Sequence, residues 1–499
     1  MSRRFVGLRD RPPQPRYDAV VIGAGIGGLV CAALLCGAGM RTLLVEQHYM
    51  AGGYCSTFRR RGFTFDASTH FYPLLGNPET ITGRLLRDLG VETRWIKMDP
   101  VDTFHLPDGT RFDVPADLDA YLDAVKRRFP NEAAAVDRFF NDVRRAYVIG
   151  LQHYFRDQPA ARLGEYEPLT VRDMLDRHFS DPRLKLLLTA DCPHWGSPPA
   201  RTSFIFDAML RLSYFLGNYY PEGGSQHFAD ELGRVVEARG GDILMSTRVE
   251  RIAVEHGRVT GVEIETTRGA LRGRRSVAAE VVVSNADLLL TLERLLGAAA
   301  DPEQVATVRR LRPTFPCFLS HLGVRDCDRR ELQRAQGYYW QGWDPDLVGR
   351  GALRCKIFVP TLYAPDLAPP GGDVVILQKV LELDSDEVTD WSAHKSAVEA
   401  YVFDHLRQVL PGIERHVVVR LSASARTAER FTFNRRGAML GWEMSPDQLG
   451  QKRPALASTI RGLYFVGHWT RPGGGVTPVI VSAMQAAAAI QAGRHAAND

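Results

Sequence analysis

Residues 17–46 alternate between apolar runs and glycine turns. "YDAVVI", residues 17–22, is a β-branched run typical of a buried strand, and "RTLLVE", residues 41–46, is a second one. Between them, "GLVCAALLCGAG" is rich in helix-forming Leu and Ala and ends at Gly37 and Gly39. The pattern predicts a strand, a helix and a second strand.

The stretch at residues 20–39 has no charged residue and is about as long as a membrane-spanning helix. Its glycines favour a different structure. Gly23, Gly25 and Gly28 fit G-x-G-x-x-G directly after the first strand, where they permit a tight turn, a close approach to a pyrophosphate and tight helix packing. Glu46 ends the second strand, where a carboxylate can accept ribose hydroxyls. Together these features predict a dinucleotide-binding unit.

The remaining pattern divides the chain into helical and strand-rich parts. Residues 76 to about 215 are predicted to be mostly helical, because their apolar positions recur at intervals of three and four. A helix at residues 226–239 and a buried strand at 278–287 follow, and residues 310–445 alternate strands with aromatic stretches. A strand at 463–466, a glycine turn and a small-residue helix end the pattern.

Composition narrows the class of protein. The chain has 499 residues, 45% hydrophobic and 24% charged, which is ordinary for a soluble enzyme. Its net charge of +4 gives no support for nucleic-acid binding. The seven cysteines have no C-x-x-C spacing, which predicts reduced thiols in the cytoplasm and no metal site. No signal peptide is expected. Apart from residues 20–39, which are assigned to the dinucleotide-binding unit, no segment is expected to be long and apolar enough to span a membrane.

Four further stretches carry a family resemblance. "MAGGYCSTFRRRGFTFDASTHF" follows Glu46 and resembles a second nucleotide motif, with Gly52 and Gly53 soon after the acid. With "YYPEGGSQHFADEL", "GGDILMSTRVERI" and "LYFVGHWTRPGGGVTPVIVSAM", the chain resembles the phytoene desaturase family of FAD-dependent oxidoreductases, and within it the carotenoid isomerase and retinol saturase branch. The resemblance is thin at residues 80–215 and 310–445, which would shape the substrate site.

The resemblance implies roles for individual residues. Gly23, Gly25, Gly28 and Glu46 would hold the ADP half of FAD, Gly52 and Gly53 would pass close to the pyrophosphate, and Val249 would pair with the adenine through its backbone. The positions implied beside the ribityl chain and flavin ring are Gly467, His468, Gly475, Val476 and Thr477. Two positions depart from the family pattern: Tyr54 stands where many relatives have Arg, and His468 where many have an acid. A histidine cannot reproduce a carboxylate's contacts to ribityl hydroxyls.

The implied fold class is α/β. A doubly wound FAD/NAD(P)-binding Rossmann-like domain would be assembled from residues 1–75, 219–309 and 451–499. A discontinuous α+β substrate domain would be built from the helical residues 76–218 and from residues 310–450.

Two residues are candidates for contact with a substrate. His70 lies just beyond the second motif, where family members bring the chain to the flavin, although a structural hydrogen bond at a turn would also explain it. Tyr220 precedes a Gly-Gly turn and would line the cavity, or simply pack in the core. No catalytic acid or base is identified.

The function expected from the resemblance is FAD-dependent oxidoreduction of carbon–carbon double bonds in a long polyene or isoprenoid lipid, by a desaturase, isomerase or saturase. A flavin amine oxidase is an alternative, and a non-catalytic isoprenoid chaperone of the Rab-escort type is another. Because no second G-x-G-x-x-G appears, a quinone or oxygen is the expected electron acceptor. A lipophilic substrate implies a cytoplasmic protein in peripheral contact with membranes.

Overall fold

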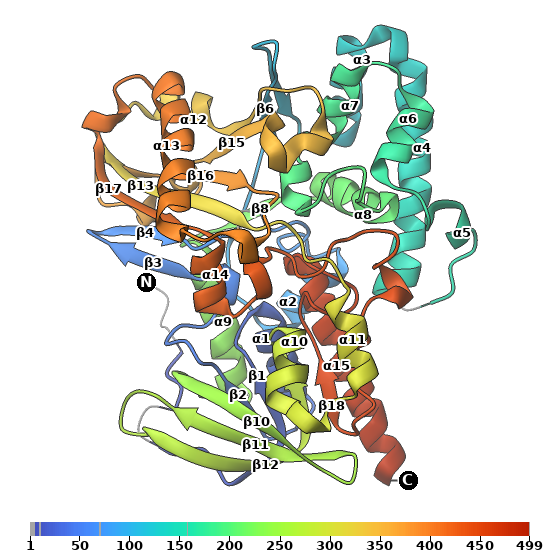
Figure 1. Ribbon diagram of the computed structural model, residues 1–499, viewed down its shortest axis with the longest axis vertical. Helices are drawn as coiled ribbons and strands as arrows, with labels where there is room; N and C mark the ends of the chain where they lie inside the picture. Colours follow the sequence, from blue (N-terminus) through green and yellow to red (C-terminus); the bar gives the residue numbers. More distant parts are fainter. Residues whose placement is uncertain (1–4, 9–10, 69–70, 157, 499) are drawn as a thin grey trace.

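Two seven-stranded sheets and a layer of helices make up the molecule (Figure 1). The computed structural model describes residues 5–8, 11–68, 71–156 and 158–498. The lower sheet of Figure 1 takes its strands from three separated parts of the chain, and the upper sheet takes its strands from two.

The predicted strand–helix–strand unit lies in the middle of the lower sheet. β1 (Arg16–Ile22) and β2 (Thr42–Val45) pair in parallel, and α1 (Ile26–Gly37) connects them. All four residues of β2 are buried, as in parallel strands that are covered on both faces. A Cβ atom at Gly28 would collide with the carbonyl oxygen of Gly23, so glycine is required for α1 to pack this closely on the loop.

The other strands of the lower sheet come from the middle and the end of the chain. They are β9 (Asp242–Leu244), β10 (Thr247–Glu255), β11 (Arg258–Thr266), β12 (Gly273–Ser284) and β18 (Leu463–Phe465). The order is β10-β11-β12-β1-β2-β9, with β18 parallel to β12. The structure thus confirms the predicted α/β class and the dinucleotide-binding domain; the division of the chain into five segments stays a prediction.

Three helices pack together on this sheet: α1, α9 (Ser225–Ala238) and α15 (Val476–Asn498). Apart from residues 20–39, no segment was expected to be long and apolar enough to span a membrane, and this expectation needs correction. Residues 476–494 of α15 are long and apolar enough to cross a membrane by length and composition. Ile480, Ala483 and Ala486, however, are buried in the core with α1, so we interpret α15 as a core helix.

The upper sheet has the order β17-β13-β16-β15-β14-β6-β7. Its strands are β6 (Asp102–His105), β7 (Arg111–Val114), β13 (Cys317–Arg325), β14 (Gly337–Trp340), β15 (Leu353–Phe358), β16 (Gly372–Val380) and β17 (Val417–Ala423). β6 and β7 come from the part predicted to be mostly helical. They are four residues each and complete the edge beside β14, so their pairing depends on a strand more than 200 residues away.

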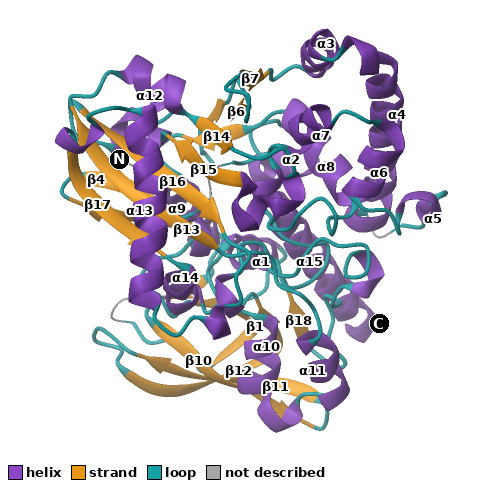
Figure 2. Ribbon diagram, turned by 45° about the horizontal axis from the view of Figure 1, so that its top comes forward, coloured by secondary structure: helices purple, strands orange, loops and turns teal. Residues whose placement is uncertain are grey.

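Helices of the predicted helical region form a layer beside the upper sheet (Figure 2). They are α3 (Leu118–Arg128), α4 (Ala133–Gly150), α5 (Leu163–Tyr166), α6 (Val171–His178), α7 (Pro182–Thr189) and α8 (Phe204–Phe215). Elsewhere lie α2 (Ile81–Leu89), α10 (Leu288–Leu290), α11 (Pro302–Arg309), α12 (Arg329–Ala335), α13 (Trp391–Val409) and α14 (Ala425–Thr432). Four short strands complete the fold: β3 (Thr57–Arg60), β4 (Phe63–Asp66), β5 (Trp95–Lys97) and β8 (Tyr219–Pro221).

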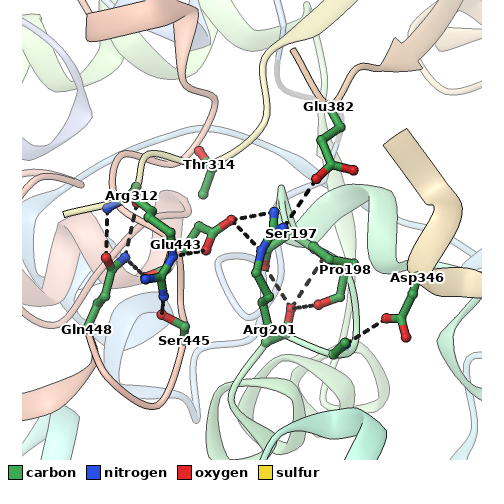
Figure 3. Close-up of polar contacts among 12 residues, drawn as sticks. Ser197, Pro198, Arg201, Arg312, Thr314, Asp346, Glu382, Glu443, Ser445 and Gln448 are labelled. Carbon is green, nitrogen blue, oxygen red and sulfur yellow. Dashed lines mark hydrogen bonds and ion pairs between the residues drawn. The ribbon is translucent and has the colours of Figure 1, made fainter. Parts of the chain in front are cut away.

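A buried carboxylate joins the helical layer to the other parts (Figure 3). Glu443 accepts hydrogen bonds from Arg201, which precedes α8, and from Arg312, which precedes β13. Arg201 also pairs with Glu382, and Arg312 donates to the side chain of Ser445. Burial raises the pKa of Glu443, and the two guanidinium groups oppose that effect. This clamp lies next to Met444 and so holds one wall of the cavity described below.

Candidate functional site

One large cavity of about 650 Å³ opens between the two sheets and the helical layer. Its volume is typical of a site for a cofactor or a drug-sized ligand. The ends of β1 and β2 form one part of its wall, strands β13 and β17 form another, and helices α4 and α8 form a third. The cavity is therefore bounded by both sheets and by the helical layer.

The first glycine loop lies at the end of β1 and leads into α1. Gly23 has a φ of +94°, and Gly25 caps the helix without a side-chain hydrogen bond. Both line the cavity, as do Ile26 and Gly27. The first N–H groups of a helix have no partner within it, so this N-terminus offers donors and a positive dipole end to an anion.

Asn285, at the end of β12, fixes this loop. Its backbone N–H donates to Ile22, and its side-chain amide donates to the carbonyl of Gly23 at 3.3 Å. A Cβ atom on Gly25 would lie 2.9 Å from the Asn285 amide nitrogen, and one on Gly467 would lie 2.7 Å from the amide oxygen. Asn285 was missed at the sequence level, because its only signal is a small polar residue after a buried strand.

Glu46 is placed beside the glycine loop. Its two carboxylate oxygens accept hydrogen bonds from the backbone N–H groups of Ala24 and His48, both at 2.7 Å. Burial raises the pKa of the carboxyl group, and the backbone N–H donors work in the opposite direction. Each oxygen keeps a further lone pair, so Glu46 can still accept hydroxyl donors from the cavity.

The second glycine pair rests on the first loop. The N–H of Gly52 donates to Ala24, and a Cβ atom on Gly53 would lie 3.5 Å from the Cα of Gly25. Gly52 has a φ of +114°, in the region that favours glycine. The structure therefore brings together Gly23, Gly25, Gly52 and Gly53, which the sequence had assigned to one phosphate site.

Val249, on the edge strand β10, also lines the cavity. Two residues earlier, the N–H of Thr247 leaves the sheet and donates to the carbonyl of Glu46. Because N–H groups along a strand alternate in direction, the N–H of Val249 points to the same side as that of Thr247. This is the geometry needed for the predicted backbone contact with a flat ring.

The C-terminal glycine turn lies at the other end of the nucleotide part of the cavity. Gly467, His468, Gly475, Val476 and Thr477 all line the cavity. Gly467 donates its N–H to Ser482 on α15, and the hydroxyl of Thr477 donates to the carbonyl of Pro73 at 2.7 Å. The turn is thus tied both to its own helix and to the segment after the second glycine motif.

His468 replaces the acid that the family pattern would place here. Burial lowers its pKa to about 3, with the nearby Arg453 acting in the same direction, so the ring is neutral. Its Nε2 lies 3.1 Å from the Oδ1 of Asn434, which also accepts from Trp469. With its proton on Nε2, the ring keeps Nδ1 as an acceptor, which is one acceptor where a carboxylate has several. Tyr54, the second departure, donates its hydroxyl to the carbonyl of Ala438.

Beyond the nucleotide motifs the cavity wall is mostly apolar. The helical layer contributes Tyr147, Leu151, Tyr154, Phe155, Phe206, Met209, Leu210 and Tyr214. The strands and the last loops contribute Phe58, Phe71, Leu319, Leu421, Met439, Leu440, Met444 and Leu449. Among the described lining residues, Glu46 is the only carboxylate, and it lies in the nucleotide part.

The two predicted substrate residues have different outcomes. Tyr220 is fully buried and does not line the cavity in the described part of the chain. Its hydroxyl donates to Asp66, and its ring packs near Phe358 and Tyr363, so the structure places it in the core rather than against a substrate. His70 lies outside the described residues. Two histidines that sequence reasoning passed over, His194 and His321, line the cavity instead.

Comparison with known proteins places the chain in a family. The pattern of the family described as "Flavin containing amine oxidoreductase" matches residues 26–491. Prolycopene isomerase 1, chloroplastic, from an Oncidium hybrid cultivar is 27% identical over 94% of this chain and 83% of its own length. All-trans-retinol 13,14-reductase from Macaca fascicularis is 31% identical over 91% of this chain and 82% of its own. Phytoene desaturase (neurosporene-forming) from Cereibacter sphaeroides is 26% identical over 95% and 94%.

Solved structures agree on the fold. The crystal structure of an oxidoreductase from Methanosarcina mazei superimposes with a TM-score of 0.67 at 19% identity, covering 94% of this chain and 99% of that one. Putrescine oxidase bound to putrescine superimposes with a TM-score of 0.68 at 15% identity, covering 96% and 100%. At these identities the likeness concerns the fold alone.

The buried histidine of the cavity wall leads to a prediction about pH. Burial lowers the pKa of His321 to about 4, whereas an unfolded histidine titrates near 6.5. Between these two values the unfolded chain binds a proton that the folded chain does not, so the free energy of unfolding falls as the pH is lowered from about 6.5 to about 4. His321→Gln, which can still donate to the carbonyl of Asp66, should remove this loss, which is about 3 kcal/mol for a difference of about 2.5 pKa units.

The measurement is denaturant unfolding at several pH values with saturating cofactor. His227→Gln, at a partly exposed position on α9, is the matched control and should leave the pH dependence as in the wild type. If His321→Gln gives a curve parallel to the wild type, burial of this imidazole does not govern acid stability.

Proposed function

This chain belongs to the flavin containing amine oxidoreductase family, and on that premise we propose that it changes carbon–carbon double bonds of a long polyene or isoprenoid lipid. It is an FAD-dependent oxidoreductase. The observation that carries the proposed substrate is the cavity beyond the nucleotide motifs, which has an apolar wall and no described carboxylate.

The residues that line the nucleotide part of the cavity fit FAD. The uncapped N-terminus of α1 lies at the cavity wall, and Gly25 leaves a space against Asn285 that a side chain would fill. The pyrophosphate would lie there, and Glu46 would accept the ribose hydroxyls. Val249 would meet the adenine through its N–H. When bound, FAD supplies two-electron redox chemistry at its ring.

The chain's own residues position both molecules. Thr477 ties the C-terminal turn, which would hold the flavin end of FAD, to Pro73 in the segment after the second glycine motif, so the two segments stay in one arrangement. His468 remains neutral through the physiological pH range, so it adds no charge beside the ribityl chain. The aromatic and aliphatic side chains of α4 and α8 would exclude water and orient a lipid by shape, since a polyene offers few hydrogen-bonding groups.

An amine substrate is supported less well. The family description and the putrescine oxidase structure both concern amines, but an ammonium group entering the cavity loses its hydration and needs a counter-charge. Glu46, the only carboxylate on the described wall, lies in the nucleotide part, so no described carboxylate of the substrate part offers one. A neutral polyene needs no counter-charge.

Access to the cavity suggests contact with a membrane. Phe431 on α14 and Tyr49 line the cavity and are each about half exposed, at 53% and 51%. Arg430 lies over the ring of Phe431, and Arg268 lies over the ring of Tyr49. Exposed aromatic rings flanked by basic side chains suit the headgroup region of an anionic membrane. A peripheral, cytoplasmic location would bring this face of the protein to the membrane, and a quinone or oxygen would take up the electrons.

The glycine loop and Glu46 give a prediction on cofactor affinity. Gly25→Val should abolish FAD binding, because a branched side chain would fill the path of the pyrophosphate. Glu46→Ala should weaken binding by about 10- to 100-fold, the expected effect of losing charged hydrogen bonds of about 1.5–3 kcal/mol. Fluorescence titration of apoprotein with FAD measures both. Gly164→Ala is the control, since a Cβ atom there meets nothing within 4 Å. Normal affinity in Gly25→Val would contradict this placement.

The substrate class is tested with named probes. Prolycopene, phytoene and all-trans-retinol, in detergent, would be incubated anaerobically with the oxidised and with the reduced holoenzyme, and the products separated by chromatography. We expect at least one polyene to be converted in one redox state, and putrescine to leave the flavin absorbance unchanged. Rapid flavin reduction by putrescine, with all three polyenes unaltered in both states, would replace this proposal with an amine oxidase.

Membrane contact is tested by liposome flotation. The double variant Tyr49→Ser, Phe431→Ser should reduce the fraction that floats with anionic vesicles several-fold, and high salt should weaken wild-type binding. Leu347→Ser is the matched control, because Leu347 is comparably exposed at 43% but does not line the cavity. Wild-type protein that stays in solution with every vesicle composition would contradict the idea.

A further inference from the structure

A second, much smaller cavity lies behind the wall of the first. Its volume is about 30 Å³, enough for one water molecule. Phe71, His194 and Tyr214 line both cavities and therefore separate them. On its far side the small cavity is lined by Asp102, Asp191 and Arg211 among apolar residues. A polar space of this kind is suited to a bound water.

Next to it, four polar side chains form a connected cluster. The Nζ of Lys356 on β15 lies 2.9 Å from the Oδ2 of Asp102 on β6 and 3.3 Å from the hydroxyl oxygen of Tyr338 on β14. The Tyr338 hydroxyl lies 2.5 Å from the Nε2 of His194 in η4 (Cys192–Trp195), and the Nζ of Lys356 lies 3.4 Å from the same Nε2. Because an ammonium group only donates, Lys356 donates to Asp102 and Tyr338, and Tyr338 donates to His194.

The cluster is buried except at its histidine end. The side chain of Lys356 is 1% exposed and that of Asp102 is 8% exposed. The Lys356 ammonium also lies 3.8 Å from the centre of the Phe71 ring, which fixes it behind that ring. Two buried charges are hard to explain by stability alone, since apolar side chains of similar volume are often as stable.

The histidine end lies near the C-terminal glycine turn. The ring of His194 packs on that of Phe71, with centroids 4.3 Å apart. Two residues after Phe71, Pro73 accepts the hydroxyl hydrogen bond of Thr477, the residue assigned above to the flavin end of the site. The cluster therefore reaches the main cavity at its flavin end.

Resting on the function proposed above, we propose that Asp102, Lys356 and Tyr338 form a proton relay that ends at His194 and exchanges a proton with a carbon atom of the polyene, with the small cavity as its water reservoir. His194 is the group that meets the substrate. Tyr338 and Lys356 are positioning residues that act through it.

Adding hydrogen to a double bond needs a hydride and a proton, and the relay supplies the proton. The proton leaves the imidazole of His194 to form a C–H bond. The Tyr338 proton then moves to the Nε2 of His194, and a Lys356 proton moves to the Tyr338 oxygen. Lys356 is then neutral beside ionised Asp102, and a proton taken up from bulk solvent and passed on through the water of the small cavity restores it, so that no hydroxide ion is left behind. Forming a double bond runs these transfers backwards. The hydride and its electron pair belong to the flavin in both directions.

The charge state of Lys356 suits this role. Burial lowers its pKa to about 8, against the opposing effects of Asp102 and Asp191, so it can lose a proton near neutral pH. The titratable groups that face it are Asp102, Asp191, Tyr338 and His194. The other buried cation near the small cavity, Arg211, is held by Asp207 and keeps its charge.

Two variants of the holoenzyme test the relay, with whichever of prolycopene, phytoene or all-trans-retinol the wild type converts. Tyr338→Phe removes the hydroxyl that links Lys356 to His194 while keeping the ring, and leaves only the longer 3.4 Å contact between Lys356 and His194. Lys356→Arg keeps the charge beside Asp102 but cannot lose a proton. We expect kcat to fall at least 100-fold in both, the usual effect of losing general acid–base catalysis, with KM nearly unchanged. The wild-type kcat profile should show a limb near pH 8 that is absent in Lys356→Arg.

Two neighbours provide matched controls. Tyr339→Phe alters the next residue on β14, whose hydroxyl donates to Ala335 and not to the cluster. Lys379→Arg alters a second buried lysine of the same sheet, whose Nζ donates to Leu353. Both should keep the wild-type kcat and pH profile. FAD content and the melting temperature of every variant establish that it folds and binds cofactor.

Deuterium from D₂O gives a readout that a structural role would not move. In a saturation or isomerisation, the wild type should place solvent deuterium on a polyene carbon, and Tyr338→Phe should lose that incorporation in proportion to kcat. The relay is overturned if Tyr338→Phe and Lys356→Arg keep the wild-type kcat, or if they change KM alone. If the wild type converts none of the three polyenes, the proposed function fails instead.

Discussion

The side chain of Asn285 is the contact on which the site depends. It lies where the end of β12, the first glycine loop and the C-terminal turn meet, and side chains at Gly25, Gly27 or Gly467 would overlap it. Three parts of the chain separated by more than 150 residues are thereby held in one arrangement. Because each part supplies its own share of the cofactor site, the site exists only when all three meet.

The substrate part of the cavity is held by different means. The helical layer and the upper sheet form its apolar wall, and the chain connects them to the nucleotide domain at only a few points. The Arg201–Glu443–Arg312 clamp joins these parts at a buried carboxylate (Figure 3). Removing one partner would leave buried charge uncompensated, so the clamp fixes the distance between the apolar wall and the C-terminal turn.

The buried polar groups fall into two kinds. Arg453 donates to the carbonyls of Trp442, Glu443, His468 and Thr470, which accounts for its place in the core as a support of the C-terminal turn. The Asp102–Lys356–Tyr338–His194 cluster joins three strands to η4, with Asp102 and His194 lining the small cavity and His194 lining the main one as well. Apolar surroundings position a polyene by shape alone, so any proton that its chemistry needs must come from a small number of such groups.

The sequence by itself determined the nucleotide domain. G-x-G-x-x-G between two apolar runs, with Glu46 at the end of the second, is a local pattern. A local pattern can be recognised without knowing which distant residues pack against it. The tertiary structure decided the rest. Strands β6 and β7 form because β14 lies beside them, Tyr220 is in the core because Asp66 binds its hydroxyl, and His468 is neutral because burial removes its charge. Asn285, His194 and Lys356 carry no motif, since their chemistry arises from neighbours that are distant in sequence and are brought close only by folding.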